Sequence, residues 1–79
     1  MREVEITSEP VELYKILKFE GMVGSGGEAK LVIAEGMVRV NGQVETRKRK
    51  KIIAGDIIEF ADDVIRVQLA GENASSAGE

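Results

Sequence analysis

The sequence predicts a small α+β domain in which two N-terminal helices pack on an antiparallel sheet of about four short strands. Two observations lead to this fold class. Apolar residues recur mostly at helical spacing in the first half of the chain, and from Met37 onward they alternate as in half-buried strands. The 79 residues can hold one domain that buries about 60% of the surface of its unfolded chain. We therefore expect no deep substrate cavity.

The first helix is predicted for about residues 9–18. Pro10 suits a first helical turn, and Ser8 is the expected N-cap. Lys15 and Lys18 fall on the more polar side, where we expect a solvated face, with a peripheral ligand contact as the alternative. The apolar residues of this helix are Val11, Leu13, Ile16 and Leu17.

The second helix is predicted for about residues 26–35, and both of its ends are marked. Ser25 and Glu28 stand at capping-box spacing, and Gly36 follows the last periodic residue as a helix-ending glycine should. Lys30 points outward in the N-terminal half. The apolar stripe consists of Ala29, Val32 and Ile33.

Gly26 and Gly27 stand in the first turn of this helix, where each costs about 1 kcal/mol relative to alanine. One explanation is the close approach of a phosphate to free backbone N–H groups at the positive end of the helix dipole. The other is steric relief where two helices cross. The sequence leaves both open.

The strands follow the second helix. Val38 and Val40 share one face of the first strand, and Asn41-Gly42 is the strongest short signal for a hairpin. Val44 continues the inward face of the returning strand. Two later strands repeat the alternation at Ile58 and Phe60, then at Ile65, Val67 and Leu69. The domain is expected to span residues 1–69, with a disordered tail at residues 70–79, which are small, polar and without period.

Charge is concentrated in the middle of the chain. The formal net charge is −3, yet residues 30–51 carry seven cations against two anions. Five of these cations are consecutive: Arg47, Lys48, Arg49, Lys50 and Lys51. A polyanion would meet this segment first. The alternative is an edge or loop kept soluble by its charge, although two or three cations would suffice for that.

The composition excludes several classes of site. The chain has no cysteine and no histidine, so disulfides, thiolate or imidazole metal sites, and catalytic triads built on either residue are absent. Asp56, Asp62 and Asp63 form the densest carboxylate group, but they fall in predicted turns, where structural roles are expected. No nucleophile, positioned base or cofactor loop is recognisable. We therefore expect no catalytic residue, cofactor, metal or small-molecule substrate.

The apolar stretches are too short to cross a bilayer, and the first five residues lack the apolar core of a signal peptide. We expect a soluble, cytoplasmic protein without membrane contact. The alternation leaves no obvious large apolar patch, so a monomer is the expected oligomeric state.

Three segments in this order and spacing resemble the S-four RNA-binding domain, also called the αL module. They are residues 25–30 (Ser-Gly-Gly-Glu-Ala-Lys), residues 33–42 (Ile-Ala-Glu-Gly-Met-Val-Arg-Val-Asn-Gly) and residues 51–56 (Lys-Ile-Ile-Ala-Gly-Asp). The resemblance covers about residues 10–60 and is nearest to the small stand-alone bacterial members, the YbcJ-like proteins. One departure is Gly26, since a basic residue commonly follows the serine that opens the second helix in this family.

The resemblance implies binding of structured RNA, ribosomal or transfer RNA among the possible classes, with ribosome association as one setting. The contact surface would be the N-terminal end of the second helix together with the following loop and hairpin. The matching candidates are Ser25, Gly26, Gly27, Lys30, Arg39, Asn41, Arg47, Lys48, Arg49, Lys50 and Lys51, with Lys15 and Lys18 at the periphery.

The aromatic residues favour paired over single-stranded RNA. Tyr14, Phe19 and Phe60 are the only aromatics, and we expect all three in the core or at its margin, which disfavours base stacking. Duplex or junction RNA is therefore the expected ligand. Two further hypotheses stay open: an adaptor whose basic loop docks an acidic protein, and a remnant of an RNA-modifying enzyme. Of these two, the missing catalytic domain argues against the enzyme.

Overall fold

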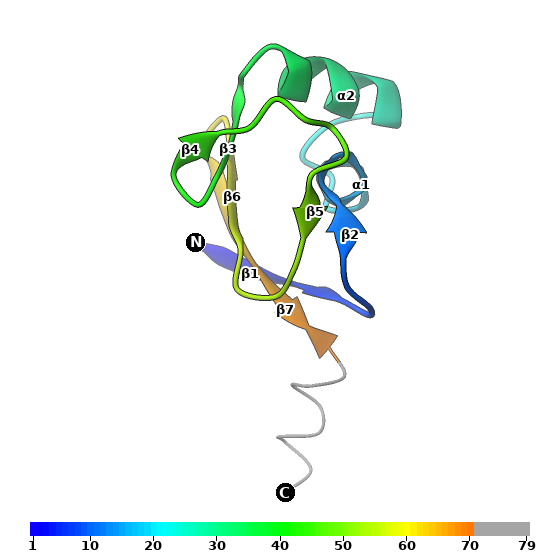
Figure 1. Ribbon diagram of the computed structural model, residues 1–79, viewed down its shortest axis with the longest axis vertical. Coiled ribbons are helices and arrows are strands. Elements are labelled where there is room, and N and C mark those ends of the chain that lie inside the picture. Colours follow the sequence, from blue (N-terminus) through cyan, green and yellow to red (C-terminus); the bar gives the residue numbers. More distant parts are fainter. Residues whose placement is uncertain (71–79) are drawn as a thin grey trace, which may run out of the picture.

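The computed structural model describes residues 1–70, which form two helices and two sheets (Figure 1). The larger sheet has five strands in the order β1-β7-β6-β3-β4, and β2 pairs with β5 in a separate two-stranded sheet. The predicted α+β class is confirmed. The elements are β1 (Arg2–Ile6), β2 (Val11–Glu12), α1 (Leu13–Phe19), α2 (Gly26–Ala34), β3 (Val38–Val40), β4 (Gln43–Val44), β5 (Lys51–Ile52), β6 (Ile57–Phe60) and β7 (Asp63–Leu69).

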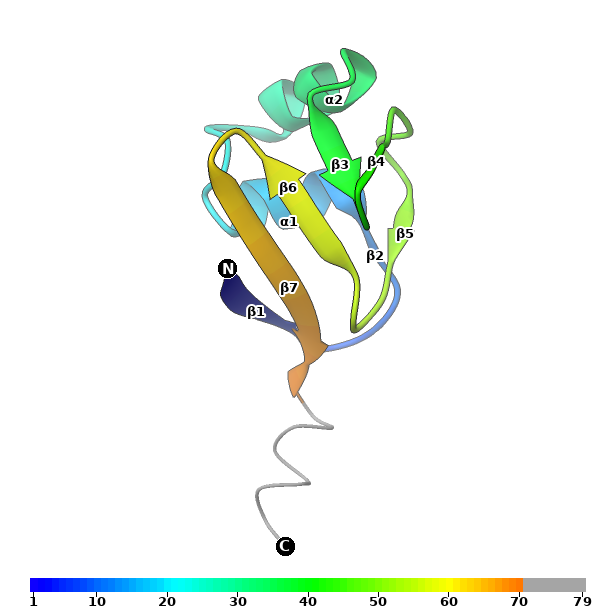
Figure 2. The same ribbon diagram turned by 90° about the vertical axis from the view of Figure 1, so that its left-hand side faces the viewer.

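Both helices lie on the same side of the larger sheet. In Figure 2, β7, β6 and β3 stand in front of α1, and no helix covers the face toward the viewer. Apolar side chains from both helices and from both sheets form one buried cluster, and no polar or charged side chain of residues 1–70 is buried. The largest fully buried members are Leu13, Leu17, Ile33, Val38, Ile52, Ile58, Ile65 and Val67.

The larger sheet is mixed: three of its strand pairings are antiparallel, as predicted, one is parallel, and it has five strands instead of about four. A strand that was not predicted, β1, pairs in parallel with β7, with Val4 opposite Val67. Val4 and Ile6 are buried while Glu3 and Glu5 are exposed, so the alternation is present in the sequence. Two apolar residues among charged ones are a weak signal for a strand. The sequence also does not show the pairing of β1 with β7, which lies about sixty residues away.

Helix α1 begins at Leu13, four residues later than predicted, and neither Ser8 nor Pro10 starts it. The predicted first turn contains β2 instead, which pairs with β5. No side chain caps the helix. The backbone N–H groups of Leu13 and Tyr14 donate to the carbonyl oxygens of Lys50 and Lys48, at 2.9 and 3.1 Å. Because these carbonyls satisfy the first helical donors, a capping side chain is unnecessary.

Helix α2 confirms its predicted end signals. The Ser25 hydroxyl accepts a hydrogen bond from the Glu28 N–H at 3.1 Å, and the Glu28 carboxylate accepts one from the Gly24 N–H at 2.8 Å. At the other end Gly36 has a φ of +77°, and the Gly36 and Met37 N–H groups donate to carbonyls of the last turn. This is a Schellman motif, which requires a residue with positive φ at the position of Gly36.

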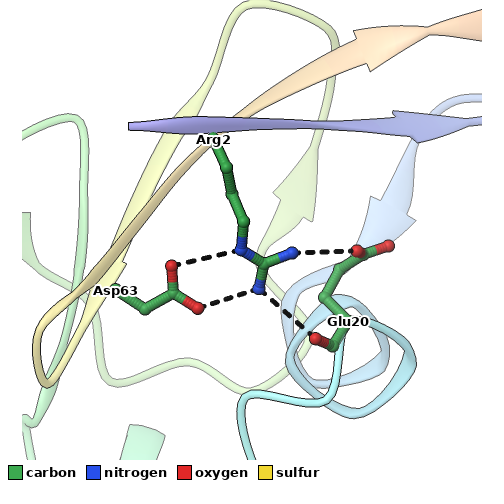
Figure 3. Close-up of polar contacts among 3 residues, drawn as sticks. All are labelled: Arg2, Glu20 and Asp63. Atoms are coloured by element: carbon green, nitrogen blue, oxygen red, sulfur yellow. Dashed lines mark hydrogen bonds and ion pairs between the residues drawn. The ribbon is translucent and has the colours of Figure 1, made fainter.

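Arg2 ties β1 to the first residue of β7 and to the end of α1 (Figure 3). Its guanidinium donates to both carboxylate oxygens of Asp63, at 3.3 and 2.8 Å, and to the Glu20 carbonyl at 3.3 Å. The Glu20 carboxylate lies 3.5 Å away. The expected structural role of Asp63 is therefore confirmed.

The Arg2 contact makes part of the stability dependent on pH. Its hydrogen bond, and then its charge, lower the pKa of Asp63 below the usual value. A carboxylate with a lowered folded-state pKa stabilises the protein above its unfolded-state pKa, and this contribution is lost as the pH falls through the folded-state value. We expect Asp63→Asn to lower the melting temperature near neutral pH. Between about pH 5 and pH 2, the melting temperature of this variant should fall less than that of the unchanged protein.

Thermal unfolding followed by circular dichroism across this pH range checks the expectation. Asp62→Asn is the matched control, because Asp62 directly precedes Asp63 and has no ion pair with Arg2 in the described structure. A melting temperature that falls as steeply for Asp63→Asn as for the unchanged protein contradicts the role given to the contact.

Candidate nucleic-acid interface

The five consecutive cations, residues 47–51, form the basic loop, which connects β4 to β5 and is bent. The Lys50 N–H donates to the Arg47 carbonyl at 3.1 Å, which places Lys48 and Arg49 at the tip of a turn. Lys51 is the first residue of β5. A fully extended run would divide its side chains between opposite sides, whereas a bend can direct more of them toward one ligand.

The carbonyl groups of this loop hold it in place. Those of Lys48 and Lys50 accept the hydrogen bonds from the start of α1, and the next residue after Lys51, Ile52, is fully buried. The side chains of Arg47, Lys48, Arg49 and Lys51 are exposed, and Lys50 is partly exposed. The backbone is therefore anchored while the charged groups face solvent.

A hollow of about 790 Å³ separates the basic loop from α2. In Figure 1 the chain from β4 to β5 passes beneath α2 at this place. Lys30 and Ala34, one turn apart on α2, form one wall. All five residues of the basic loop and Thr46 form the other. We call this hollow the basic groove.

A second hollow of about 790 Å³ lies between α1, β2 and the N-terminal end of α2, and we call it the helix hollow. It shares Lys30 and Lys51 with the basic groove, so the two hollows adjoin. The predicted candidates that line it are Lys15, Lys18, Gly26, Gly27, Lys30 and Lys51. The Lys30 ammonium lies 4.8 Å from the centre of the Tyr14 ring, a cation–π distance that holds it between the two hollows.

The two glycines of α2 are not required by helix packing. A Cβ atom added to Gly26 would lie 3.8 Å from Lys18 Cδ, and one added to Gly27 would lie 3.9 Å from Ser25 Oγ. Both are ordinary van der Waals distances. Steric relief at a helix crossing is therefore wrong as the explanation. A surface without side chains at the positive end of the α2 dipole is what an approaching anion needs.

Arg47 differs from the other cations of the loop because it is paired. Its Nε donates to the Glu45 carboxylate at 2.9 Å, and its N–H groups make two further bonds to the same carboxylate. The hydrogen bond from Arg47, and then the charges of Arg47 and Lys50, lower the pKa of Glu45. Within residues 1–70, Arg47 is the one cation of the loop that has a carboxylate within 4 Å. Its charge is thus partly neutralised.

The geometry is that of a positively charged, bent surface next to a helix N-terminus. A family model for the S4 domain matches residues 4–68. The chain belongs to the S4 domain family. The resemblance inferred from the three sequence segments is confirmed.

Curated relatives of this S4 domain include "Putative RNA-binding protein YbcJ" of Escherichia coli (strain K12). It is 54% identical over 57 residues, which are 72% of this chain and 81% of the relative. "Probable ribosome maturation protein RlbA" of Bacillus subtilis (strain 168) is 34% identical over the same length, 72% of this chain and 80% of the relative.

A solved structure has the same fold. The solution structure of YbcJ from Escherichia coli, described as revealing an αL motif involved in RNA binding, matches with a TM-score of 0.67 at 46% sequence identity. The match covers 86% of this chain and 87% of that one. The predicted αL fold is therefore confirmed for this S4 domain.

Three predicted contact residues of the S4 domain, Ser25, Arg39 and Asn41, line neither hollow. Ser25 caps α2 instead. Arg39 is exposed on β3, where its register partners are Val44 and Glu59 on the neighbouring strands. Asn41 has a φ of +53° and uses both polar groups of its side chain. Its Nδ2 donates to Asp56 at 3.0 Å, and its Oδ1 accepts from Ile57 N–H at 2.9 Å.

Asn41 thus has a structural role, which a hairpin signal read from two adjacent residues could not reveal. It fastens the β3–β4 turn to the start of β6. Asp56 completes this link with its second oxygen, which accepts from the Ile53 N–H at 3.0 Å. The RNA contacts that the resemblance implied for Arg39 and Asn41 stay predictions.

Phe19 was assigned to the core or its margin, and this was wrong, because 69% of the residue is exposed. Tyr14 and Phe60 do pack against the core as expected. A helical wheel contains the missed signal: at 100° per residue, Phe19 lies about 110° from the centre of the stripe formed by Leu13, Ile16 and Leu17.

Other kinds of site are not recognisable in residues 1–70. No group of three or more His, Cys, Asp or Glu side chains is placed to hold a metal ion there. None of the helices in this part of the chain has the length and apolar character needed to span a membrane.

The structural role of Asn41 leads to a prediction. Asn41→Ala removes two hydrogen bonds and places alanine at positive φ, so we expect the free energy of unfolding to fall by about 1–2 kcal/mol. Because Asp56 is the partner, a double-mutant cycle of Asn41→Ala and Asp56→Ala should give a coupling energy of about 0.5 kcal/mol or more. Urea unfolding measures all four free energies. Additive effects would mean that the two side chains do not act together.

Proposed function

We propose that this protein is a non-catalytic RNA-binding protein that recognises structured RNA, duplex or junction, through the basic groove and the N-terminal end of α2. The observation that carries the proposal is the convergence of the basic loop with Lys30 of α2 around one groove. Segments 17 or more residues apart in sequence thereby present six cations to one ligand.

The charge distribution favours a polyanion. The domain has a net charge of −3, while the groove is lined by cations and by no carboxylate. An acidic surface elsewhere repels RNA and orients the groove toward it. Each phosphate that a cation neutralises releases a counterion and adds close to one unit to the salt dependence of the affinity on a duplex. Five to seven contacts would weaken binding about a thousandfold between 50 and 200 mM salt.

The shape of the groove favours structured RNA over a specific base sequence. The turn at Lys48 and Arg49 makes a convex tip, with α2 on the opposite wall of the groove. Lysine and arginine heads on such a surface suit phosphates of a folded backbone, and they do not by themselves read bases. Proteins recognise double-stranded RNA largely by such phosphate and 2′-hydroxyl contacts.

The relatives support the same class of ligand. YbcJ carries the name "Putative RNA-binding protein", and RlbA the name "Probable ribosome maturation protein". Ribosomal RNA, free or in an assembling particle, is therefore the first ligand to test, and we place the activity in the cytoplasm, where this RNA is made. The monomeric state stays a prediction.

The absence of catalysis is part of the proposal. The chain has no cysteine or histidine, and in the described residues the carboxylates of Asp56 and Asp63 are engaged in hydrogen bonds that hold the fold. What the groove offers an RNA is binding and positioning.

The test is a fluorescence titration with a hairpin-junction RNA, DNA of the same sequence and an unpaired strand, at two salt concentrations. We expect preference for the structured RNA and a steep salt dependence. Equal weak binding of all three nucleic acids, together with saturable binding of an acidic protein, would overturn the proposal in favour of an adaptor.

Substitution of the tip of the basic loop tests the groove directly. Replacing Lys48, Arg49 and Lys50 together with alanine should weaken binding of the hairpin-junction RNA tenfold or more, because up to three phosphate contacts are lost. The slope of log K against log salt should fall by up to about 2.7 units. The melting temperature should change little, since exposed charges contribute little to stability. Arg66→Ala, on the uncovered face of the sheet, is the control and should bind as the unchanged protein does.

A charge at the start of α2 tests the approach of phosphate to that end of the helix. Gly27→Glu should weaken RNA binding several-fold, because a carboxylate then occupies the surface that the phosphate needs. It should not destabilise the helix, since an acidic residue in the first turn is favourable and glycine is not. Gly27→Gln has the same shape without the charge and is the matched control. Equal dissociation constants for the two variants would contradict phosphate binding at this end.

A further inference from the structure

We infer that Phe19 is a stacking site for an unpaired base, next to the surface that holds the RNA backbone. The inference rests on the proposed function and adds to it a preference for a duplex that continues into an unpaired nucleotide. It assigns a role to a residue that neither the resemblance nor the electrostatic argument singled out.

The position of Phe19 at the end of α1 leaves its ring open to solvent. The residue is 69% exposed, the largest exposed fraction among the bulky apolar residues of residues 1–70. The chain turns away directly after it, at Gly21, which has a φ of +71°. Single exposed apolar residues are common, and what sets Phe19 apart from the other exposed bulky apolar residues of residues 1–70 is that it lines the helix hollow.

The side of Phe19 that faces the helix hollow is basic. Phe19 lines this hollow together with Lys15 and Lys18, and the Lys18 ammonium lies 6.0 Å from the centre of the Phe19 ring. Lys18 also passes close to Gly26 at the N-terminal end of α2. Glu12 is the carboxylate of this hollow, and it lies 3.7 Å from the Lys15 ammonium. A phosphate bound by Lys18 would place the attached base within reach of the ring.

The other side of Phe19 is apolar and acidic. A smaller hollow of about 180 Å³ there is lined by Ile6, Val11 and Ile16 and by the carboxylate-bearing Glu5 and Glu20. The carboxylates disfavour a phosphate on this side, and the apolar side chains favour the face or edge of a base. The two sides of the ring therefore orient a nucleotide, with its phosphate toward Lys18 and its base on Phe19.

The connection between the helix hollow and the basic groove indicates which kind of RNA would bind at Phe19. The helix hollow and the basic groove share Lys30 and Lys51, so a backbone bound in the groove can continue past Lys30 toward Lys18 and Phe19. A base pair inside a duplex has both faces covered by its neighbours and cannot stack on a protein ring, whereas the first unpaired base beyond a duplex can. The ligand that fits both hollows is thus a duplex with a single-stranded extension.

The experiment compares two hairpin RNAs, one blunt and one with a short unpaired extension that contains 2-aminopurine, whose fluorescence falls when it stacks. Separate RNAs with 5′ and 3′ extensions cover both polarities. The unchanged protein should bind one extended RNA about 5- to 150-fold more tightly than the blunt RNA, the range that one base stacked on an aromatic ring gives. The 2-aminopurine signal should fall on binding.

Phe19→Leu removes the ring and keeps an apolar side chain. We expect it to abolish the preference and the fluorescence decrease, while blunt RNA binds as before, and we expect Phe19→Trp to restore both. Leu31→Ala is the matched control, since Leu31 is an apolar residue of α2 that is 56% exposed and lies outside both hollows. Melting temperatures verify that each variant is folded.

The outcomes separate this inference from the proposed function. If Phe19→Leu keeps the preference and the fluorescence decrease, or if the unchanged protein never distinguishes the extended RNAs from the blunt one, the stacking site is overturned while groove binding stands. If the unchanged protein binds neither kind of RNA, both proposals are overturned.

Discussion

The two backbone hydrogen bonds between the basic loop and the start of α1 are the constraint on which this structure depends. The carbonyls of Lys48 and Lys50 accept from the N–H groups of Tyr14 and Leu13. Five adjacent cations repel one another and would by themselves favour an open, mobile segment. Here the loop is fixed through its main chain, and α1 obtains the cap that its own sequence lacks. The side chains take no part in these bonds, so the loop is held without using the charges that a ligand needs.

The same constraint sets the position of the two hollows. With the loop fixed to α1, Lys51 lies where the basic groove and the helix hollow meet, opposite Lys30 of α2. The hydrogen bonds of Ser25 and Glu28 at one end and the Schellman motif at the other fix α2 and thereby the place of Lys30. A surface that is formed before the ligand arrives loses less conformational entropy on binding. The Arg47 side chain is also positioned before a ligand binds, because its hydrogen bond to Glu45 restricts its conformations. The Glu45 carboxylate partly neutralises its charge.

Local signals in the sequence predicted the elements that depend on neighbouring residues. Ser25, Glu28 and Gly36 defined α2 almost to the residue, and Asn41-Gly42 marked the β3–β4 hairpin. Most of the errors fall where distant segments decide the conformation; Phe19 and Val44, which were expected to face inward and are each more than half exposed, are the exceptions. Val11 and Glu12 form a strand because β5 is beside them, and β1 forms because β7 offers an edge. The cations that gather at the groove could be predicted as a run, but the meeting of the loop with Lys30 depends on the tertiary fold. The predicted tail at residues 70–79 lies, apart from Ala70, outside the described residues.

The central claim is that structured RNA contacts the basic groove and the N-terminal end of α2, and backbone amide NMR during a titration with hairpin RNA tests it most directly. The account predicts that the largest shift changes occur at Gly26, Gly27, Lys30 and residues 47–51, while the amides of β1 and of the exposed face around Arg66 change little. Shift changes concentrated on the uncovered face of the sheet, with residues 47–51 unaffected, would contradict it.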